Sequence, residues 1–199
     1  MDASRRLSGG TAWLCCLALL LIATDSFGAQ KQGTKRDAAA RERGKYLVTL
    51  GGCHDCHTPK RMTEKGPALD GDRLLAGYPS GTPLPPVPQG VAGPGGWGGL
   101  FTHDLTGWAG PWGVSFASNL SPDKETGIGA WTRETFIKVL RTGKTPGGRP
   151  LLPPMPWENL KAATDRDLSD LFDYLMSVRP VRNAVPGPIP PKGGSAGGT

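Results

Sequence analysis

Long apolar runs are missing from this sequence, and none reaches the ~20 residues that a membrane-spanning helix requires. This absence excludes an ordinary polytopic membrane protein. Blocks of Lys and Arg interleaved with aromatic residues are missing too, so a net charge of +6 does not indicate a nucleic-acid-binding protein. Long β-branched runs are also absent, which counts against folds that alternate buried strands with helices.

Apolar side chains are scarce as well. Hydrophobic residues make up only 37% of the 199 positions, whereas Gly and Pro contribute 30 and 20 residues. A chain of this composition cannot build a large core from its own side chains alone. We therefore expect another source of cohesion, such as a large apolar cofactor.

Residues 1–28 have the layout of an export signal. Two arginines begin the segment, an apolar stretch follows, and small residues precede the expected cleavage site. An uncleaved anchor is the alternative, although the apolar stretch is short for spanning a bilayer. Cys15 and Cys16 lie within this segment, so the mature chain would keep two cysteines, Cys53 and Cys56.

The rest of the chain divides by composition and periodicity. Residues 29–36 are expected to form a flexible lead, 37–179 a folded domain, and 180–199 a disordered tail rich in Pro and Gly. Within the domain, residues 60–118 have little periodicity, so we expect a long irregular insert there, rich in Gly, Pro and Trp.

Helices are predicted on both sides of the insert. The first runs from Asp37 to Leu50. The second begins after an N-cap at Thr132 and ends at Gly143, and the third begins after Thr164. The third helix has apolar side chains at i, i+3, i+4 and i+7, which predicts one buried face. Those residues are Leu168, Leu171, Phe172 and Leu175.

A glycine in the first helix has a predicted structural role. Glycine within a helix costs about 1 kcal/mol relative to alanine, so Gly44 needs a reason to be there. A residue without a side chain lets two backbones approach closely. We expect the first and last helices to cross where Gly44 meets Tyr174.

The stretch Cys53-His54-Asp55-Cys56-His57 is a C-x-x-C-H motif, which is typical of covalent c-type haem attachment. On a helical turn, thiols at i and i+3 share a face and can reach two vinyl groups on one porphyrin edge. A histidine at i+4 is then placed to bind the iron. Cys53 and Cys56 are the predicted attachment residues, and His57 is the predicted axial ligand.

Two other interpretations of the motif are open. A thioredoxin-like dithiol would place C-x-x-C at the start of a helix and lower a thiol pKa, but the strand-rich pattern of that fold is missing. A closed zinc site needs four ligands, and beyond the motif His103 is the one remaining histidine.

With its flanking helices, the motif resembles a class I monohaem cytochrome c. Residues 117–123, 126–129 and 152–157 are similar, more narrowly, to the cytochrome c domains that accompany bacterial alcohol, aldehyde and related dehydrogenases. The resemblance implies an all-α fold in which cytochrome c-like helices surround one covalently bound haem c. It leaves most of the insert uncovered.

The resemblance also implies a methionine opposite His57, supplied by a loop before the last helix. Met155 matches that position, and neighbouring prolines would lower the entropy lost in holding its thioether on iron. Trp157 would wall the pocket. His103 is the alternative ligand. Met62 is interpreted as a surface residue and Met176 as core filler.

Iron with both axial positions filled has no open site for oxygen or peroxide, so the expected function is one-electron transfer. We predict a periplasmic electron carrier, not an enzyme, between a dehydrogenase donor and an oxidase or another cytochrome. Its basic surface would steer it to an acidic patch on a partner. The alternative is a peroxidase-like haem enzyme or a sensor with a labile sixth ligand, in which His103 and Asp104 would be candidate acid and base.

Overall fold

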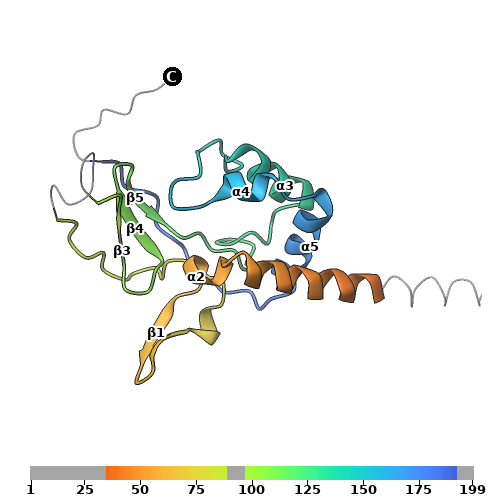
Figure 1. The fold of residues 1–199 in the computed structure, drawn as a ribbon, viewed down its shortest axis with the longest axis horizontal. Helices are drawn as coiled ribbons and strands as arrows, with labels where there is room; N and C mark the ends of the chain where they lie inside the picture. The colour runs from red at the N-terminus through yellow and green to blue at the C-terminus, as the bar shows by residue number, and fades with distance from the viewer. Residues whose placement is uncertain (1–34, 89–96, 192–199) are drawn as a thin grey trace, which may run out of the picture. The chain divides into compact units, whose positions relative to one another are not determined.

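The structure is a computed structural model that describes residues 35–88 and 97–191 (Figure 1). The predicted export signal, residues 29–34 of the lead and residues 192–199 of the tail lie outside the described residues. Contacts divide the chain between residues 39 and 40, and the fold below is that of the second unit.

The first helix of this unit ends where the sequence predicts. Helical structure is described from residue 35 and continues to residue 50, and a turn at Gly51 and Gly52 follows. Val48 is its fully buried residue. A Cβ placed on Gly44 would lie 1.9 Å from the carbonyl oxygen of Asp170 and 2.7 Å from the Cβ of Tyr174. The predicted crossing of the first and last helices is therefore confirmed.

Three further helices follow the insert: α3 (Arg133–Thr142), α4 (Trp157–Lys161) and α5 (Asp165–Leu175). The side chains of Thr132 and Thr164 accept hydrogen bonds from backbone N–H groups in the first turns of α3 and α5, as N-caps do. Gly143 ends α3 with a φ of 64°, as predicted. None of the helices within residues 35–88 and 97–191 is long and apolar enough to span a membrane.

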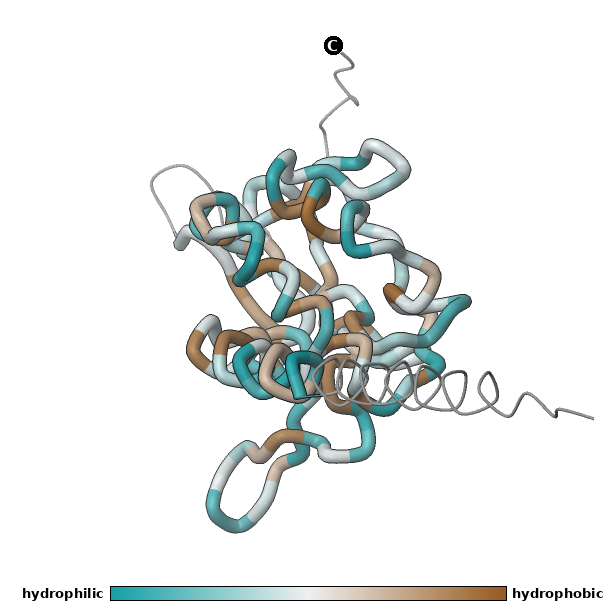
Figure 2. The backbone as a smooth tube through the Cα atoms, turned by 90° about the vertical axis from the view of Figure 1, so that its right-hand side faces the viewer, coloured by the Kyte–Doolittle hydropathy of each residue, from teal (hydrophilic) through white to brown (hydrophobic). Residues whose placement is uncertain are grey.

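One apolar core joins these helices. The rings of Phe136 and Phe172 bring α3 and α5 together, with centroids 5.5 Å apart. Apolar residues occur as short, separate stretches along the backbone (Figure 2), in keeping with the low apolar content. The buried members of the core are Val48, Leu75, Ile128, Phe136, Leu140, Leu168, Leu171, Phe172 and Leu175.

The expected all-α fold is wrong: the protein is mixed α/β. The segment 60–118, expected to be irregular, contains two antiparallel sheets within its described residues. One is a hairpin of β1 (Lys60–Thr63) and β2 (Gly66–Leu69), followed by the short helix η1 (Gly71–Arg73). The other has the order β3-β4-β5 and consists of β3 (Leu100–Phe101), β4 (Gly107–Gly110) and β5 (Gly113–Phe116).

Aromatic packing accompanies the strands of the three-stranded sheet. β4 contains two glycines, and aromatic rings fill the space that their missing side chains leave. A Cβ on Gly107 would lie 3.2 Å from the ring of Tyr78, and one on Gly110 would lie 2.4 Å from the ring of Trp112. Glycine is depleted in strands, so strand propensity gives no signal for β4.

Residues 180–191 also differ from the predicted disordered tail. This segment runs extended toward the three-stranded sheet, where Ile189 pairs with Val114 of β5 through two backbone hydrogen bonds of 2.7 and 2.9 Å (Figure 1). Pro and Gly are abundant in it, but backbone pairing needs no apolar side chains. Composition alone therefore misses the order of residues 180–191.

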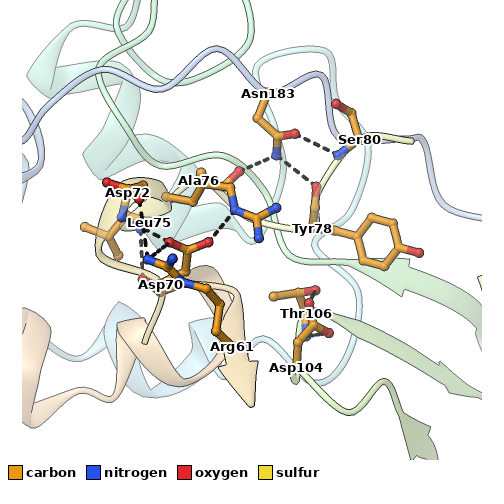
Figure 3. Close-up of polar contacts among 12 residues, drawn as sticks. Arg61, Asp70, Asp72, Leu75, Ala76, Tyr78, Ser80, Asp104, Thr106 and Asn183 are labelled. Atoms are coloured by element: carbon orange, nitrogen blue, oxygen red, sulfur yellow. Dashed lines mark hydrogen bonds and ion pairs between the residues drawn. The ribbon is translucent and has the colours of Figure 1, made fainter. Parts of the chain in front are cut away.

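One buried asparagine anchors the same segment. The side-chain amide of Asn183 donates to the carbonyl oxygens of Ala76 and Tyr78 at 2.7 and 2.8 Å. Its carbonyl oxygen accepts from the backbone N–H of Ser80 at 2.8 Å (Figure 3). These bonds tie residues 180–191 to the segment that follows η1.

Candidate haem-binding site

The C-x-x-C-H motif forms its own short helix, α2 (Cys53–His57), directly after the first helix. Gly52 allows the tight connection because its φ is 64°, a left-handed value that glycine adopts without strain. Both cysteines are free thiols, and both are partly buried. Cys53 packs against the apolar core. The two thiols are therefore one helical turn apart, and that of Cys53 lies against apolar side chains.

The His57 ring is buried and held by one backbone carbonyl. Only 8% of the residue is exposed, and Nδ1 lies 2.8 Å from the carbonyl oxygen of Ser118. Because a carbonyl can only accept, Nδ1 carries the proton and Nε2 is the nitrogen left to bind a metal. Burial lowers the pKa of His57, while the bond to Ser118 opposes that shift. The ring is thus neutral near pH 7, the form that binds metals.

Two segments of the insert flank the motif and hold the carbonyl of Ser118 in place. The backbone N–H of Gly77 donates to the carbonyl oxygen of His57 at 2.8 Å, and that of Tyr78 donates to Ala117 at 2.9 Å. Gly77 is required here, because its φ is 77° and a Cβ would lie 2.3 Å from the carbonyl oxygen of Ala117. Residues predicted to be irregular therefore set the position of Ser118.

The residue after the motif makes a second set of contacts. Thr58 is fully buried, and its hydroxyl accepts a hydrogen bond of 2.9 Å from the backbone N–H of Leu75. The same hydroxyl lies 2.8 Å from Nδ1 of His54. His54 is therefore half-buried, with its Nδ1 in contact with this hydroxyl. Thr58 links the end of α2 to the apolar core through Leu75.

Buried Asp70 fastens the β1–β2 hairpin beside α2. Its carboxylate pairs with Arg61 at 2.9 Å (Figure 3). It also pairs with Arg73 at 2.6 Å, and the backbone N–H of Asp70 donates to the carbonyl oxygen of Pro59 at 2.8 Å. Burial alone would raise the pKa of Asp70, but the bonds from Arg73 and the backbone hold that pKa below its ordinary value. The carboxylate is therefore charged and locks the hairpin to the end of the motif.

The two thiols do not have the properties of a reactive dithiol. Burial raises the pKa of Cys53 to about 11 and also raises the pKa of Cys56. Redox-active C-x-x-C pairs instead have a thiol pKa lowered toward or below neutrality. The electrostatic surroundings of the motif therefore argue against the thioredoxin-like interpretation.

Met155 lies in a proline-rich loop between α3 and α4, and its side chain is partly buried against the apolar core that Cys53 also contacts. Trp157 begins α4 and packs on Gly143, where a Cβ would come within 2.4 Å of the indole ring. Met155, Trp157 and the neighbouring prolines line a hollow of ≈ 280 Å³. The candidate thioether thus packs against the apolar core, and the indole ring of Trp157 lines the same hollow.

The other candidate residues occupy different surroundings. His103 is exposed on the loop between β3 and β4. Met62 is 66% exposed, and Met176 packs against the core at the end of α5, as their interpretations require. Asp104 is buried, and its carboxylate accepts hydrogen bonds from the hydroxyls of Thr102 and Thr106 at 2.6 and 2.8 Å. These bonds occupy the group that the enzyme interpretation would use as acid or base.

The donors supplied by α2 and by the loop that contains Met155 fit a c-type haem. They comprise a neutral imidazole with a fixed tautomer, two free thiols on one helical turn and a thioether against the same apolar core. Imidazole and thioether are the axial donors of cytochromes c. Within residues 35–88 and 97–191, we find no group of three or more His, Cys, Asp or Glu side chains that could hold a metal ion.

Sequence reasoning missed the groups that position these donors. The carbonyl of Ser118 has no sequence signal, because every residue has one. The role of Thr58 and the charge pair at Asp70 depend on segments that meet only in the folded chain. A weak signal exists for Gly77, since an isolated glycine can mark a left-handed backbone.

Comparison with known proteins shows which proteins the chain resembles. No protein-family model matches the chain. Its curated relatives include cytochrome c subunits of bacterial dehydrogenases, which confirms the resemblance found in the sequence. Their names describe cytochrome subunits, in agreement with the interpretation as an electron carrier rather than an enzyme.

Three relatives are of particular interest. The chain is 29% identical over 83% of its length to the gluconate 2-dehydrogenase cytochrome c subunit of Pantoea cypripedii, and 30% identical over 82% to the fructose dehydrogenase cytochrome subunit of Gluconobacter japonicus. It is 31% identical over 75% to a nicotinate dehydrogenase subunit of Pseudomonas putida. The chain spans 29%, 27% and 9% of the length of these relatives, respectively.

Proposed function

We propose that this chain is a periplasmic electron-transfer cytochrome with one covalently bound haem c. The observation that carries the proposal is the buried His57 ring, fixed through Nδ1 on the same helical turn as two free thiols. Cys53 and Cys56 would form thioether bonds to the haem vinyl groups, and Nε2 of His57 and the sulfur of Met155 would bind the iron. When bound, the haem supplies a one-electron Fe(III)/Fe(II) couple.

Residues of the chain would tune and protect that couple. The bond from His57 to Ser118 fixes the ring orientation and raises the basicity of the ligating nitrogen. A thioether is a weak donor to Fe(III), so Met155 would favour the reduced state and raise the reduction potential. Apolar side chains around Cys53 and Met155 would keep water away.

The proposed partners are redox proteins. The names of the relatives support a dehydrogenase as the electron donor, and an oxidase or another cytochrome would be the acceptor. The net charge of +6 would steer the protein toward an acidic partner surface, an effect that salt weakens. The export-signal layout and the covalent attachment motif support a periplasmic location.

The decisive experiment is a test of covalent attachment. We expect haem to remain on the chain after acid–acetone extraction and on a denaturing gel, with one haem per chain by pyridine haemochrome assay. Changing Cys53 and Cys56 to Ala should abolish the haem stain, whereas His54→Ala, within the same motif, should retain it. Extractable haem, or no haem in the exported wild-type protein, would overturn the proposal.

A further inference from the structure

Strand β5 contacts the loop that contains Met155. The hydroxyl of Ser115 donates a hydrogen bond of 2.5 Å to the carbonyl oxygen of Pro153, two residues before Met155. The two residues are 38 positions apart in the sequence, and Ser115 is 8% exposed. This partly buried hydrogen bond connects the three-stranded sheet to the loop that contains Met155.

The loop needs a tether of this kind because of its composition. Pro153, Pro154 and Pro156 have no backbone N–H, so three of the four residues around Met155 cannot donate a backbone hydrogen bond. Met155 itself donates only to Leu152, within the loop, at 3.2 Å. The loop can therefore be hydrogen-bonded to the rest of the protein mainly through its backbone carbonyl oxygens. The hydroxyl of Ser115 is a donor to one of these oxygens.

The hydroxyl of Ser115 is itself oriented by a neighbour. The indole Nε1–H of Trp112 donates to the Ser115 oxygen at 3.2 Å, which leaves the hydroxyl hydrogen to point at Pro153. The Trp112 ring is in turn held against β4, since a Cβ on Gly110 would lie 2.4 Å from it. The donor therefore comes from a rigid part of the sheet rather than from a mobile surface residue.

The same short segment also holds the histidine. Ser118, whose carbonyl oxygen accepts from His57, lies three residues after Ser115. Three residues of extended chain span about 10 Å. One continuous stretch of the insert thus contacts both the His57 ring and the Met155 loop.

We propose that Ser115 is a positioning residue for the axial thioether. By fixing the carbonyl of Pro153 relative to the segment that holds His57, it sets where the sulfur of Met155 lies. This inference rests on the proposed function, because it requires Met155 to bind haem iron. In this inference, the three-stranded sheet of the insert holds the loop that contains Met155 in position.

The test compares Ser115→Ala with wild type in the purified holoprotein. We expect unchanged covalent haem, a weaker Met–Fe(III) charge-transfer band, and cyanide binding to the oxidised protein that is about 3- to 10-fold faster, as the loss of one hydrogen bond allows. Cyanide is a suitable probe because it binds only when the methionine leaves. Ser115→Thr, which keeps the hydroxyl, should restore wild-type behaviour.

Ser80→Ala is the matched control, since Ser80 is exposed and distant in sequence from the loop. Loss of thermal stability in Ser115→Ala without any change in the band or the cyanide rate would show a purely structural role and overturn the inference. If Ser115→Ala yields no folded holoprotein, Trp112→Phe decides by the same two readouts: a faster cyanide rate supports the inference and an unchanged rate overturns it.

A separate variant distinguishes failure of this inference from failure of the proposed function. If Met155→Ala abolishes the band while Ser115→Ala changes neither readout, Met155 is the ligand and the positioning role is wrong. If Met155→Ala leaves the band intact, the ligand assignment itself is wrong, and the role of Ser115 falls with it.

Discussion

Gly44 lies directly against the backbone of Asp170: a Cβ on Gly44 would be 1.9 Å from that carbonyl oxygen. No rotation of a side chain can relieve this clash, because the atoms involved are backbone and Cβ. Ion pairs surround the contact, with Arg43 2.5 Å from Asp167 and 3.4 Å from Asp170. The first helix and α5 are therefore held at one fixed crossing point.

We predict that substitutions of Gly44 destabilise the fold by forcing the two helices apart. Gly44→Ala should lower the free energy of unfolding by roughly 1–3 kcal/mol, and Gly44→Leu by more. Gly71→Ala is the control, because a Cβ there would meet no atom within 4 Å. Equal thermal unfolding curves for Gly44→Ala and wild type would contradict the crossing.

Replacing Met155 should expose the sixth position of the iron. We expect Met155→Ala to lose the long-wavelength Met–Fe(III) band, to bind carbon monoxide when reduced and to have a lower reduction potential, because a thioether favours Fe(II). His103→Ala and Met62→Ala should retain the wild-type spectrum and potential. A spectrum altered by His103→Ala but not by Met155→Ala would assign the ligand to His103.

Asp104 should make stability depend on pH in the acid range. Burial would raise its pKa, but hydrogen bonds from Thr102 and Thr106 outweigh burial and hold the pKa below its ordinary value. The stabilisation is therefore complete above the unfolded-state pKa of about 4 and is lost as the pH falls through the lower folded-state pKa. Asp104→Asn removes that titration.

The measurement is the midpoint of thermal unfolding from pH 7 to pH 2. Asp104→Asn should be less stable than wild type by about 1–3 kcal/mol at neutral pH, and the difference should shrink below pH 4. Glu64→Gln, at an exposed position on the β1–β2 turn, serves as the control. A difference that stays constant down to pH 2 would contradict the role of the charge.

Asn183 should be one of the costliest polar residues to replace. Asn183→Ala leaves three backbone groups near residues 76–80 without their partner, at about 1–3 kcal/mol for each group that remains buried. Asn183→Asp should be worse, since a carboxylate would face two carbonyl oxygens. Asn159→Ala, at an exposed position of α4, is the control. Chemical denaturation should separate these variants, and equal midpoints would refute the anchoring role.

The features that sequence predicts correctly here are local ones. Thr132, Thr164 and Gly143 cap helices through bonds within four residues, and the periodicity of α5 comes from one continuous face. The motif at Cys53–His57 is likewise complete within five residues. Each of these signals can be read without knowing which distant segments meet.

The features that sequence misses depend on distant pairings. Gly107 of β4 packs against the ring of Tyr78, 29 positions earlier in the sequence. Ser115 bonds Pro153 across 38 positions, through a hydroxyl and a carbonyl that occur everywhere in the chain. No periodicity marks such pairs, so the expected all-α fold omitted the sheet that braces the site.

The pairing of residues 180–191 with the rest of the domain has a consequence for the order of folding. Asn183 bonds Ala76 across 107 positions, and Ile189 closes on Val114. Contacts that span so much of the chain form late, because a large loop must close first. The proposed attachment cysteines lie near the beginning of the domain, and the residues that complete these closing contacts lie near its end. Cys53 and Cys56 therefore leave the site of synthesis before the residues that make these closing contacts have emerged.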